Sequence, residues 1–246
     1  IRTNRRRHYM KLVSRTLLLL ALLPSVGYCQ EIIWYTDDKA DLHDLFKDKP
    51  VTISTDTANL VLKSLNKYTI DFQYAPIPRI TSQLAKMENA CVANRIKTNE
   101  RLKENLFSLP LNFYPSYRLY YLKSNTSVPK GLLNSRNQLS SLLELFKVLP
   151  DNVLAIEKGR SFGTVLDKVI PQIPSKNVFV RSGNEGYSAI SNLLFIKRVD
   201  FIIAFPTEMN DRINQSKLNI KDDIQSIEIA DIDNYIVGHI ACSKSA

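Results

Sequence analysis

The sequence is poor in the residues that most often bind metal ions or act as catalytic bases. It contains three cysteines and three histidines in 246 residues, and none of them falls in a C-x-x-C or H-x-x-x-H spacing. His43 lies beside Asp41 and Asp44, a group that could bind a metal ion, but a solvent-exposed helix or turn explains these residues better. We therefore expect no metal site, no cofactor and no enzymatic activity.

Long apolar segments are also scarce, and the main one lies near the amino terminus. A short basic segment, residues 10–15, precedes the apolar residues 17–23 and a small-residue region around Gly27, which is the layout of a secretory signal. The apolar run is too short to span a membrane. We expect residues 1–29 to be upstream residues and a signal peptide, and the mature chain to be periplasmic.

The basic charge of the chain is concentrated in that same segment. The formal net charge is +9, but residues 1–29 hold six basic residues and no acidic one, which leaves 27 basic and 24 acidic residues in the rest of the chain. A net charge of +3 spread along a chain is not the basic stripe that tracks phosphates. We expect no binding to nucleic acid.

Two cysteines, Cys91 and Cys242, remain in the mature chain. An even number of cysteines in an oxidising compartment favours a disulfide bond between them. Two buried thiols are the alternative, because free cysteine packs like a small hydrophobic residue. Cys29 falls in the cleavage region, where the bulky Tyr28 argues against a lipoprotein anchor.

The mature chain alternates between strand and helix patterns, and it has no internal repeat, heptad or low-complexity segment. The expected strands are residues 31–35, 70–74, 90–93, 117–121, 153–156, 178–180, 199–205, 224–229 and 235–242. The expected helices are residues 58–65, 78–87, 139–146, 164–170, 187–196 and 208–215, the first of them capped by Asp56 or Thr57. This order predicts mainly parallel sheets with helices on both faces, and the polar residues 124–136 mark a connection between two lobes.

The segment of residues 90–123, ACVANRIKTNERLKENLFSLPLNFYPSYRLYYLK, carries two linked motifs. Thr98, Glu100 and Arg101 form T-x-E-R, and residues 107–110 form F-S-x-P. This order resembles family 3 periplasmic solute-binding proteins, the polar amino-acid receptors of ABC importers. The resemblance implies an α/β, bilobal periplasmic binding protein (type II) fold with two mainly parallel lobes joined by hinge strands.

The resemblance also implies how the chain is divided. Residues 30–122 would form the first lobe, residues 123–229 the second, and residues 230–246 a return to the first, with the hinge near Tyr121 and residues 229–235. The implied protein is a monomer that passes a ligand to an ABC transporter permease. A sensor subunit for a membrane receptor and a periplasmic dehydratase are the alternatives, and the family usually continues into a final helix after the last strand.

The candidate ligand-binding residues come partly from the resemblance and partly from the pattern. The resemblance implies that Arg101 holds a ligand carboxylate and that Thr98 adds a contact. The segment E-K-G-R-S-F-G-T, residues 157–164, follows a strand and opens a helix, so Ser161 and Thr164 could offer hydroxyl groups to an anion. An ordinary strand–helix turn is the alternative for this segment.

Aromatic residues provide the remaining candidates. Trp34 and Tyr187 lie at the ends of expected elements and could stack on a ligand, with core packing as the alternative. Val199 and Asp200 match the V-D that opens a strand in the resembled family, whose members place an aspartate for the ligand ammonium a few residues later. Phe205 stands at that place here. We therefore expect an organic anion or a modified amino acid as the ligand, carrying a carboxylate.

Overall fold

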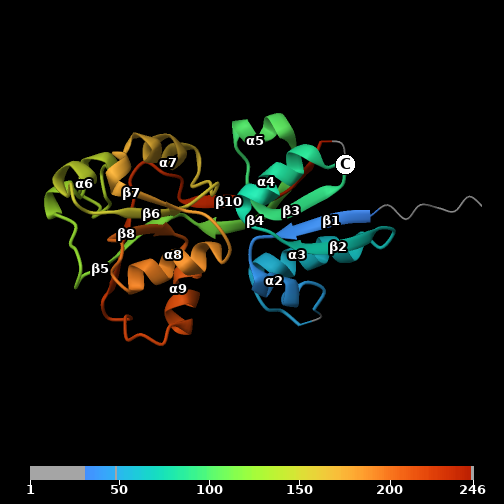
Figure 1. Cartoon of the computed structure of the whole chain (residues 1–246), viewed down its shortest axis with the longest axis horizontal. Helices are drawn as coiled ribbons and strands as arrows, with labels where there is room; N and C mark the ends of the chain where they lie inside the picture. Colours follow the sequence, from blue (N-terminus) through green and yellow to red (C-terminus); the bar gives the residue numbers. More distant parts are fainter. Residues whose placement is uncertain (1–30, 48, 245–246) are drawn as a thin grey trace, which may run out of the picture. The chain divides into compact units, whose positions relative to one another are not determined.

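The computed structural model describes residues 31–47 and 49–244. The predicted signal peptide, residues 1–29, and Cys29 lie outside the described residues. The described strands form two five-stranded sheets, each with its own helices (Figure 1).

The first sheet has the strand order β2-β1-β3-β10-β4. Strand β1 pairs in parallel with β2 and β3, whereas β10 is antiparallel to both β3 and β4. The strands are β1 (Glu31–Thr36), β2 (Thr69–Tyr74), β3 (Ala90–Ile96), β4 (Asn105–Pro115) and β10 (Tyr235–Ser243). The helices between them are α2 (Lys39–Asp44), α3 (Ile53–Ser64), α4 (Ile77–Lys86) and α5 (Asn99–Glu104).

The two faces of this sheet pack against different helices. Trp34 is buried with Leu62 of α3, whereas Tyr35 is buried with Ile80 of α4. Neighbouring residues of a strand point to opposite faces, so α3 and α4 cover opposite faces of the sheet. The amino terminus of α3 was predicted incorrectly: the helix begins at Ile53 and is capped by Thr52, because the polar run before it offers several capping side chains.

The second sheet has the strand order β7-β6-β8-β5-β9. Strands β7, β6 and β8 are parallel, and β5 is antiparallel to β8 and β9. The strands are β5 (Arg118–Leu122), β6 (Leu154–Glu157), β7 (Val178–Arg181), β8 (Phe201–Ala204) and β9 (Ile224–Glu228). The α-helices are α6 (Leu142–Val148), α7 (Thr164–Val169), α8 (Gly186–Phe195) and α9 (Pro206–Gln215), with short 3₁₀ turns at Lys130–Leu132, Ile170–Gln172 and Ser175–Asn177.

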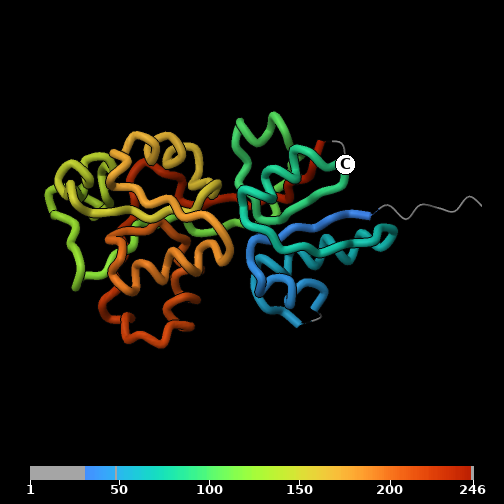
Figure 2. Tube along the Cα trace, viewed as in Figure 1, coloured from blue at the N-terminus to red at the C-terminus, as the bar shows by residue number. Residues whose placement is uncertain are grey.

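The chain crosses between the sheets twice, once after β4 and once after β9 (Figure 2). The expected division placed residues 117–122 in the first lobe, whereas β5 pairs within the second sheet. The first crossing therefore lies at residues 116–117, before the proposed hinge at Tyr121. An alternating pattern identifies a strand and its two faces, but it does not say which strand lies beside it.

The predicted disulfide bond is present between Cys91 and Cys242. The two residues face each other in the antiparallel register of β3 and β10, with their Cα atoms 4.1 Å apart. Cys91 also packs in the core beside Trp34, Ala58 and Leu62. The bond ties the last strand to the centre of the first sheet.

Candidate functional site

Arg101 lies near the start of α5, directly after β3. Its Nη1 donates a hydrogen bond to the carbonyl of Ile96 at 2.9 Å, and its Nη2 donates to the carbonyl of Gly159 at 3.3 Å. Ile96 ends β3 of the first sheet, whereas Gly159 follows β6 of the second. The guanidinium group therefore bridges the carboxyl ends of strands from both sheets, where open α/β sheets bind ligands.

Thr98 is the N-cap of α5. Its Oγ1 accepts a hydrogen bond from the backbone N–H of Arg101 at 3.3 Å. The threonine of T-x-E-R therefore fixes the start of the helix that carries Arg101. Its contact with a ligand stays a prediction.

The turn after β6 is built around two glycines. Gly159 and Gly163 have φ angles of +80° and +90°, which side chains rarely adopt. Within the turn, Ser161 is 8% exposed, and its hydroxyl donates to the carboxylate of Asp167. Thr164 is exposed at the first residue of α7. Two hydroxyl groups were predicted to contact a ligand. The Ser161 hydroxyl already donates within the turn, whereas Thr164 is exposed to solvent.

The same turn has the spacing G-x-S-x-G that accompanies a serine nucleophile in many hydrolases, a motif that the interpretation of the sequence overlooked. The nucleophile of that motif needs a histidine base. Here the Ser161 hydroxyl bonds to Asp167, while Nδ1 of His239 bonds to the carbonyl of Ser108 in β4. The turn therefore does not have the arrangement of a serine hydrolase site.

Three aromatic rings surround the guanidinium group of Arg160, which lies within this turn. Its Nη2 lies 2.6 and 2.7 Å from the two carboxylate oxygens of Glu208. Its guanidinium carbon lies 5.3 to 5.9 Å from the ring centroids of Tyr187, Phe205 and Tyr117. Burial alone would lower the pKa of Arg160, but the negative charge of Glu208 outweighs it and raises that pKa well above its ordinary value. Tyr187 is thus part of the surroundings of a paired arginine.

Phe205 packs within the same group of rings. It stacks on Tyr117 at 4.0 Å and on Tyr114 at 5.4 Å between ring centroids. The position at which the resemblance implied an aspartate is therefore part of an aromatic stack. Glu208, three residues later, is held by Arg160.

Trp34 is 3% exposed and packs against Ala58, Leu62 and Cys91. The structure thus places it in the core, which was the alternative to ligand stacking. Its large apolar ring is stabilised by this burial. We do not include Trp34 in the site.

Three charged residues near Arg101 were missed by the interpretation of the sequence. Arg95 of β3 is 8% exposed and donates from Nη2 to Oγ1 of Thr81 at 2.8 Å. Asp37, exposed after β1, and Glu157, buried at the end of β6, both act on it electrostatically. The sequence offered one signal for Arg95, a single arginine in the largely apolar segment ACVANRI. A charged residue in a buried segment attracts attention, because charged residues are seldom fully buried unless paired.

Glu157 provides a test of the electrostatics through its pKa, which burial raises from 4.5 to about 7. The folded protein then holds a proton that the unfolded chain releases between these values, so stability falls as the pH rises through this window. We expect the wild type to lose about 2 kcal/mol between pH 5 and pH 8 relative to Glu157→Gln, whose neutral amide does not titrate. Urea unfolding at both pH values measures this difference.

The exposed Glu144 provides the control for that experiment. Its carboxylate pairs with Lys147 on the surface of α6, and its side chain is 51% exposed. Glu144→Gln should keep the pH dependence of the wild type. If Glu157→Gln keeps it as well, the buried carboxyl group is not the cause.

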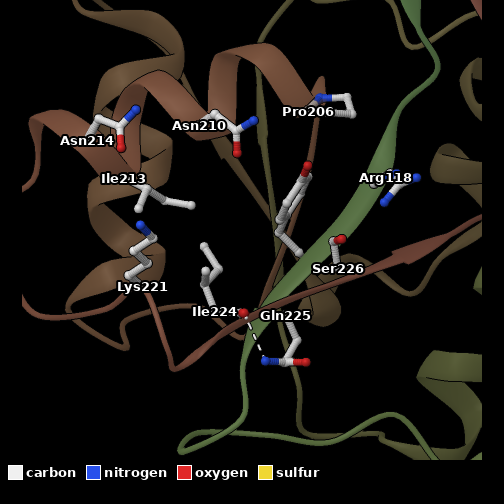
Figure 3. A pocket seen from close by; sticks show the side chains of 10 residues that line it. Arg118, Pro206, Asn210, Ile213, Asn214, Lys221, Ile224, Gln225 and Ser226 are labelled. Atoms are coloured by element: carbon white, nitrogen blue, oxygen red, sulfur yellow. Dashed lines mark hydrogen bonds between the residues drawn. The ribbon is translucent and has the colours of Figure 1, made fainter.

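A separate pocket of about 520 Å³ lies within elements of the second sheet (Figure 3). Its lining includes Arg118 of β5, Asn210 of α9, Lys221 from the segment that leads into β9, and Ile224 at the start of β9. The charge of Arg118 is paired with Glu228 at 2.7 Å, and both side chains are more than a third exposed. None of the predicted ligand-binding residues lines this pocket, so we base the candidate site on the Arg101 region.

The structure was also searched for metal sites and for membrane-spanning helices. Within residues 31–47 and 49–244, no three or more His, Cys, Asp or Glu side chains gather closely enough to hold a metal ion, and this includes the group around His43. The same part of the chain has no helix with the length and apolar character needed to cross a membrane.

At the level of sequence, no family model and no curated protein matches the chain. Its structure is similar to the substrate-binding protein of an amino acid ABC transporter, with 18% identity and a TM-score of 0.59 over 87% of this chain and 85% of the other. It is also similar to AbpA, an amino acid ABC transporter substrate-binding protein from Streptococcus pneumoniae bound to L-arginine, with 12% identity and a TM-score of 0.58 over 88% and 82%.

A histidine kinase sensor domain with similarity to periplasmic binding proteins is a further structural neighbour. It is 11% identical, with a TM-score of 0.61 over 87% of this chain and 82% of the other. Structural similarity at such low sequence identity establishes the fold of the chain and does not establish its function or its ligand. The chain has the bilobal α/β fold of periplasmic binding proteins.

Proposed function

We propose that the protein binds a small solute that carries a carboxylate group, and that Arg101 holds this carboxylate. The observation that supports the proposal is the bonding of the Arg101 guanidinium, which donates to two neutral backbone carbonyls, one beside each sheet. In the described part of the chain, no carboxylate oxygen lies within 4 Å of it. A positive charge held in this way is available to an external anion.

A carboxylate suits this site for geometric reasons. The planar guanidinium group can donate two parallel hydrogen bonds to a carboxylate, and these bonds are stronger where water is excluded. Burial lowers the pKa of Arg101, because the charged form is less well hydrated where the side chain is buried. The accessible Thr164 and the capping Thr98 are the hydroxyl groups that we propose for further contacts.

Delivery of the solute to an ABC transporter is the role that we favour for this binding. The similar substrate-binding proteins belong to amino acid ABC transporters, and one of them is bound to L-arginine. Presentation of the bound solute to a membrane receptor is the second candidate, favoured by the likeness to a histidine kinase sensor domain. The proposal includes export to the periplasm, a monomeric state and binding without chemical conversion of the solute.

A thermal-shift screen of residues 30–246 against organic acids, amino acids and their derivatives tests the proposal. A ligand present at a hundred times its dissociation constant stabilises a folded protein by about 2.7 kcal/mol, which raises the melting temperature measurably. We expect hits among carboxylates, and we expect Arg101→Met to lose them.

Arg198 provides the matched control for that variant. It is an exposed arginine before β8, so Arg198→Met removes the same charge from the surface of the second sheet's lobe. This variant should keep every hit. Hits that bind equally to Arg101→Met would assign the carboxylate to another residue, and a screen without hits would contradict solute binding itself.

A further inference from the structure

Arg95 is a second arginine near Arg101, and its charge is more deeply buried. Its guanidinium donates from Nη2 to Thr81, which engages one of its five N–H donors. Within residues 31–47 and 49–244, no carboxylate oxygen lies within 4 Å of it. Burial of a charge without a paired opposite charge is costly, so this arrangement calls for an explanation.

The contacts of α4 place the two arginines beside the same turn. A methyl group at Gly159 would lie 3.2 Å from Cγ2 of Ile77, so the first turn of α4 packs directly on the turn after β6. Arg101 donates to the carbonyl of this same glycine. Thr81, which holds Arg95, lies about one helical turn further along α4. Arg101 is therefore held at the Gly159 turn, and Arg95 is held about one helical turn of α4 away from the residue that packs on this turn.

The electrostatics agree with this placement. Burial and then the positive charge of Arg101 lower the pKa of Arg95 to about 10, so both residues are charged at neutral pH. Asp37 and Glu157 act in the opposite direction. Asp37 is exposed and screened by water, and the pKa of Glu157 is about 7. Asp167 acts on Arg101, but its carboxylate already accepts hydrogen bonds from the Ser161 hydroxyl and the Phe162 backbone N–H, so none of these carboxyl groups fully compensates the two positive charges.

We propose that Arg95 and Arg101 together bind a ligand with two carboxylate groups, each arginine holding one of them. This inference rests on the proposed function and narrows its ligand from a carboxylate to a dicarboxylate. The first carboxylate compensates Arg101, and the second compensates the buried Arg95 and removes the repulsion between the two cations. A monocarboxylate leaves one of the two charges uncompensated, so the site discriminates against it.

Titration calorimetry with matched pairs of acids tests this inference. The probes are succinate against butyrate and glutarate against valerate, which have equal carbon chains and differ by one carboxylate. We expect the wild type to bind at least one dicarboxylate more than about 10-fold more tightly than its monocarboxylate partner, because hydrogen bonds to charged groups are strong.

Single substitutions separate the two arginines. Arg95→Met should weaken dicarboxylate binding about 10- to 100-fold and leave monocarboxylate binding nearly unchanged. Arg101→Met should weaken the binding of both classes. Arg198→Met, on an exposed surface, should change neither.

The outcomes distinguish this inference from the proposed function. Equal affinities for both members of each pair, or unchanged dicarboxylate binding in Arg95→Met, overturn the dicarboxylate site and leave carboxylate binding in place. Failure of the wild type to bind any of the four acids overturns the two-arginine site for simple dicarboxylates, whereas the proposed function is lost only if the wider screen also finds no ligand. If circular dichroism shows that Arg95→Met does not fold, the comparison of the acid pairs on the wild type decides.

Discussion

Replacement of both Cys91 and Cys242 by alanine is expected to lower the free energy of unfolding by about 2–5 kcal/mol. The disulfide bond closes a loop across 151 positions of the chain, which restricts the unfolded state strongly. It also joins β3 to β10, which lies between β3 and β4 in the first sheet. If β10 separated from the sheet, its hydrogen bonds to both β3 and β4 would be lost together.

Melting experiments with and without a reductant measure this contribution. For a domain of this size, such a loss corresponds to a fall in melting temperature of about 5–15 °C. A reductant should lower the melting temperature of the wild type towards that of the double variant and leave the double variant unchanged. If the oxidised wild type and the double variant melt together, the bond contributes nothing to stability.

The second large effect is expected for Glu208→Gln, which removes the carboxylate paired with Arg160. The side chain of Arg160 is 13% exposed and that of Glu208 is 32% exposed. Removal of one partner from a buried ion pair typically costs 3–5 kcal/mol. We expect about 2–4 kcal/mol here, because Glu208 is partly hydrated and Glu157 stays 3.8 Å from Nη1 of Arg160. Urea unfolding at pH 7 gives the value.

Two comparisons identify the buried charge as the cause. Glu144→Gln removes an exposed partner of Lys147 and should cost less than about 0.5 kcal/mol. The double variant Arg160→Met/Glu208→Gln should be more stable than Glu208→Gln alone, because methionine suits the aromatic surroundings, neither charge of the pair remains, and burial keeps the pKa of the neighbouring Glu157 at about 7. A double variant that is less stable would show that Arg160 contributes mainly by packing against the rings.

Most of the secondary structure could be predicted from local patterns. The alternation of apolar residues identified nine of the ten described strands, including β5, and the helical spacing identified α4 and its proline in the first turn. The strand β4 and the short helices α2 and α5 were not predicted. The disulfide bond followed from the count of cysteines and the expected compartment. These features depend on side chains close together in the chain or on the chemistry of one residue type, so the sequence contains them directly.

The candidate site could be predicted only in part. The T-x-E-R motif pointed to Arg101, and the structure places its side chain between carbonyls beside both sheets. Trp34 was chosen as a ligand contact because it lies near the end of a strand, but its side chain points to the α3 face. Arg95 was missed, because a single basic residue in a strand pattern does not report whether its side chain is buried.

The sequence by itself determined most of the order of strands and helices and the position of Arg101 after β3, and it favoured the pairing of Cys91 with Cys242. Only the tertiary structure decided that β5 belongs to the second sheet, that Phe205 stacks between Tyr114 and Tyr117, and that Arg95 is buried beside Arg101 without a carboxylate partner. The reason is physical: local patterns report which face of an element is apolar, whereas strand neighbours and buried charges depend on contacts between residues far apart in the chain.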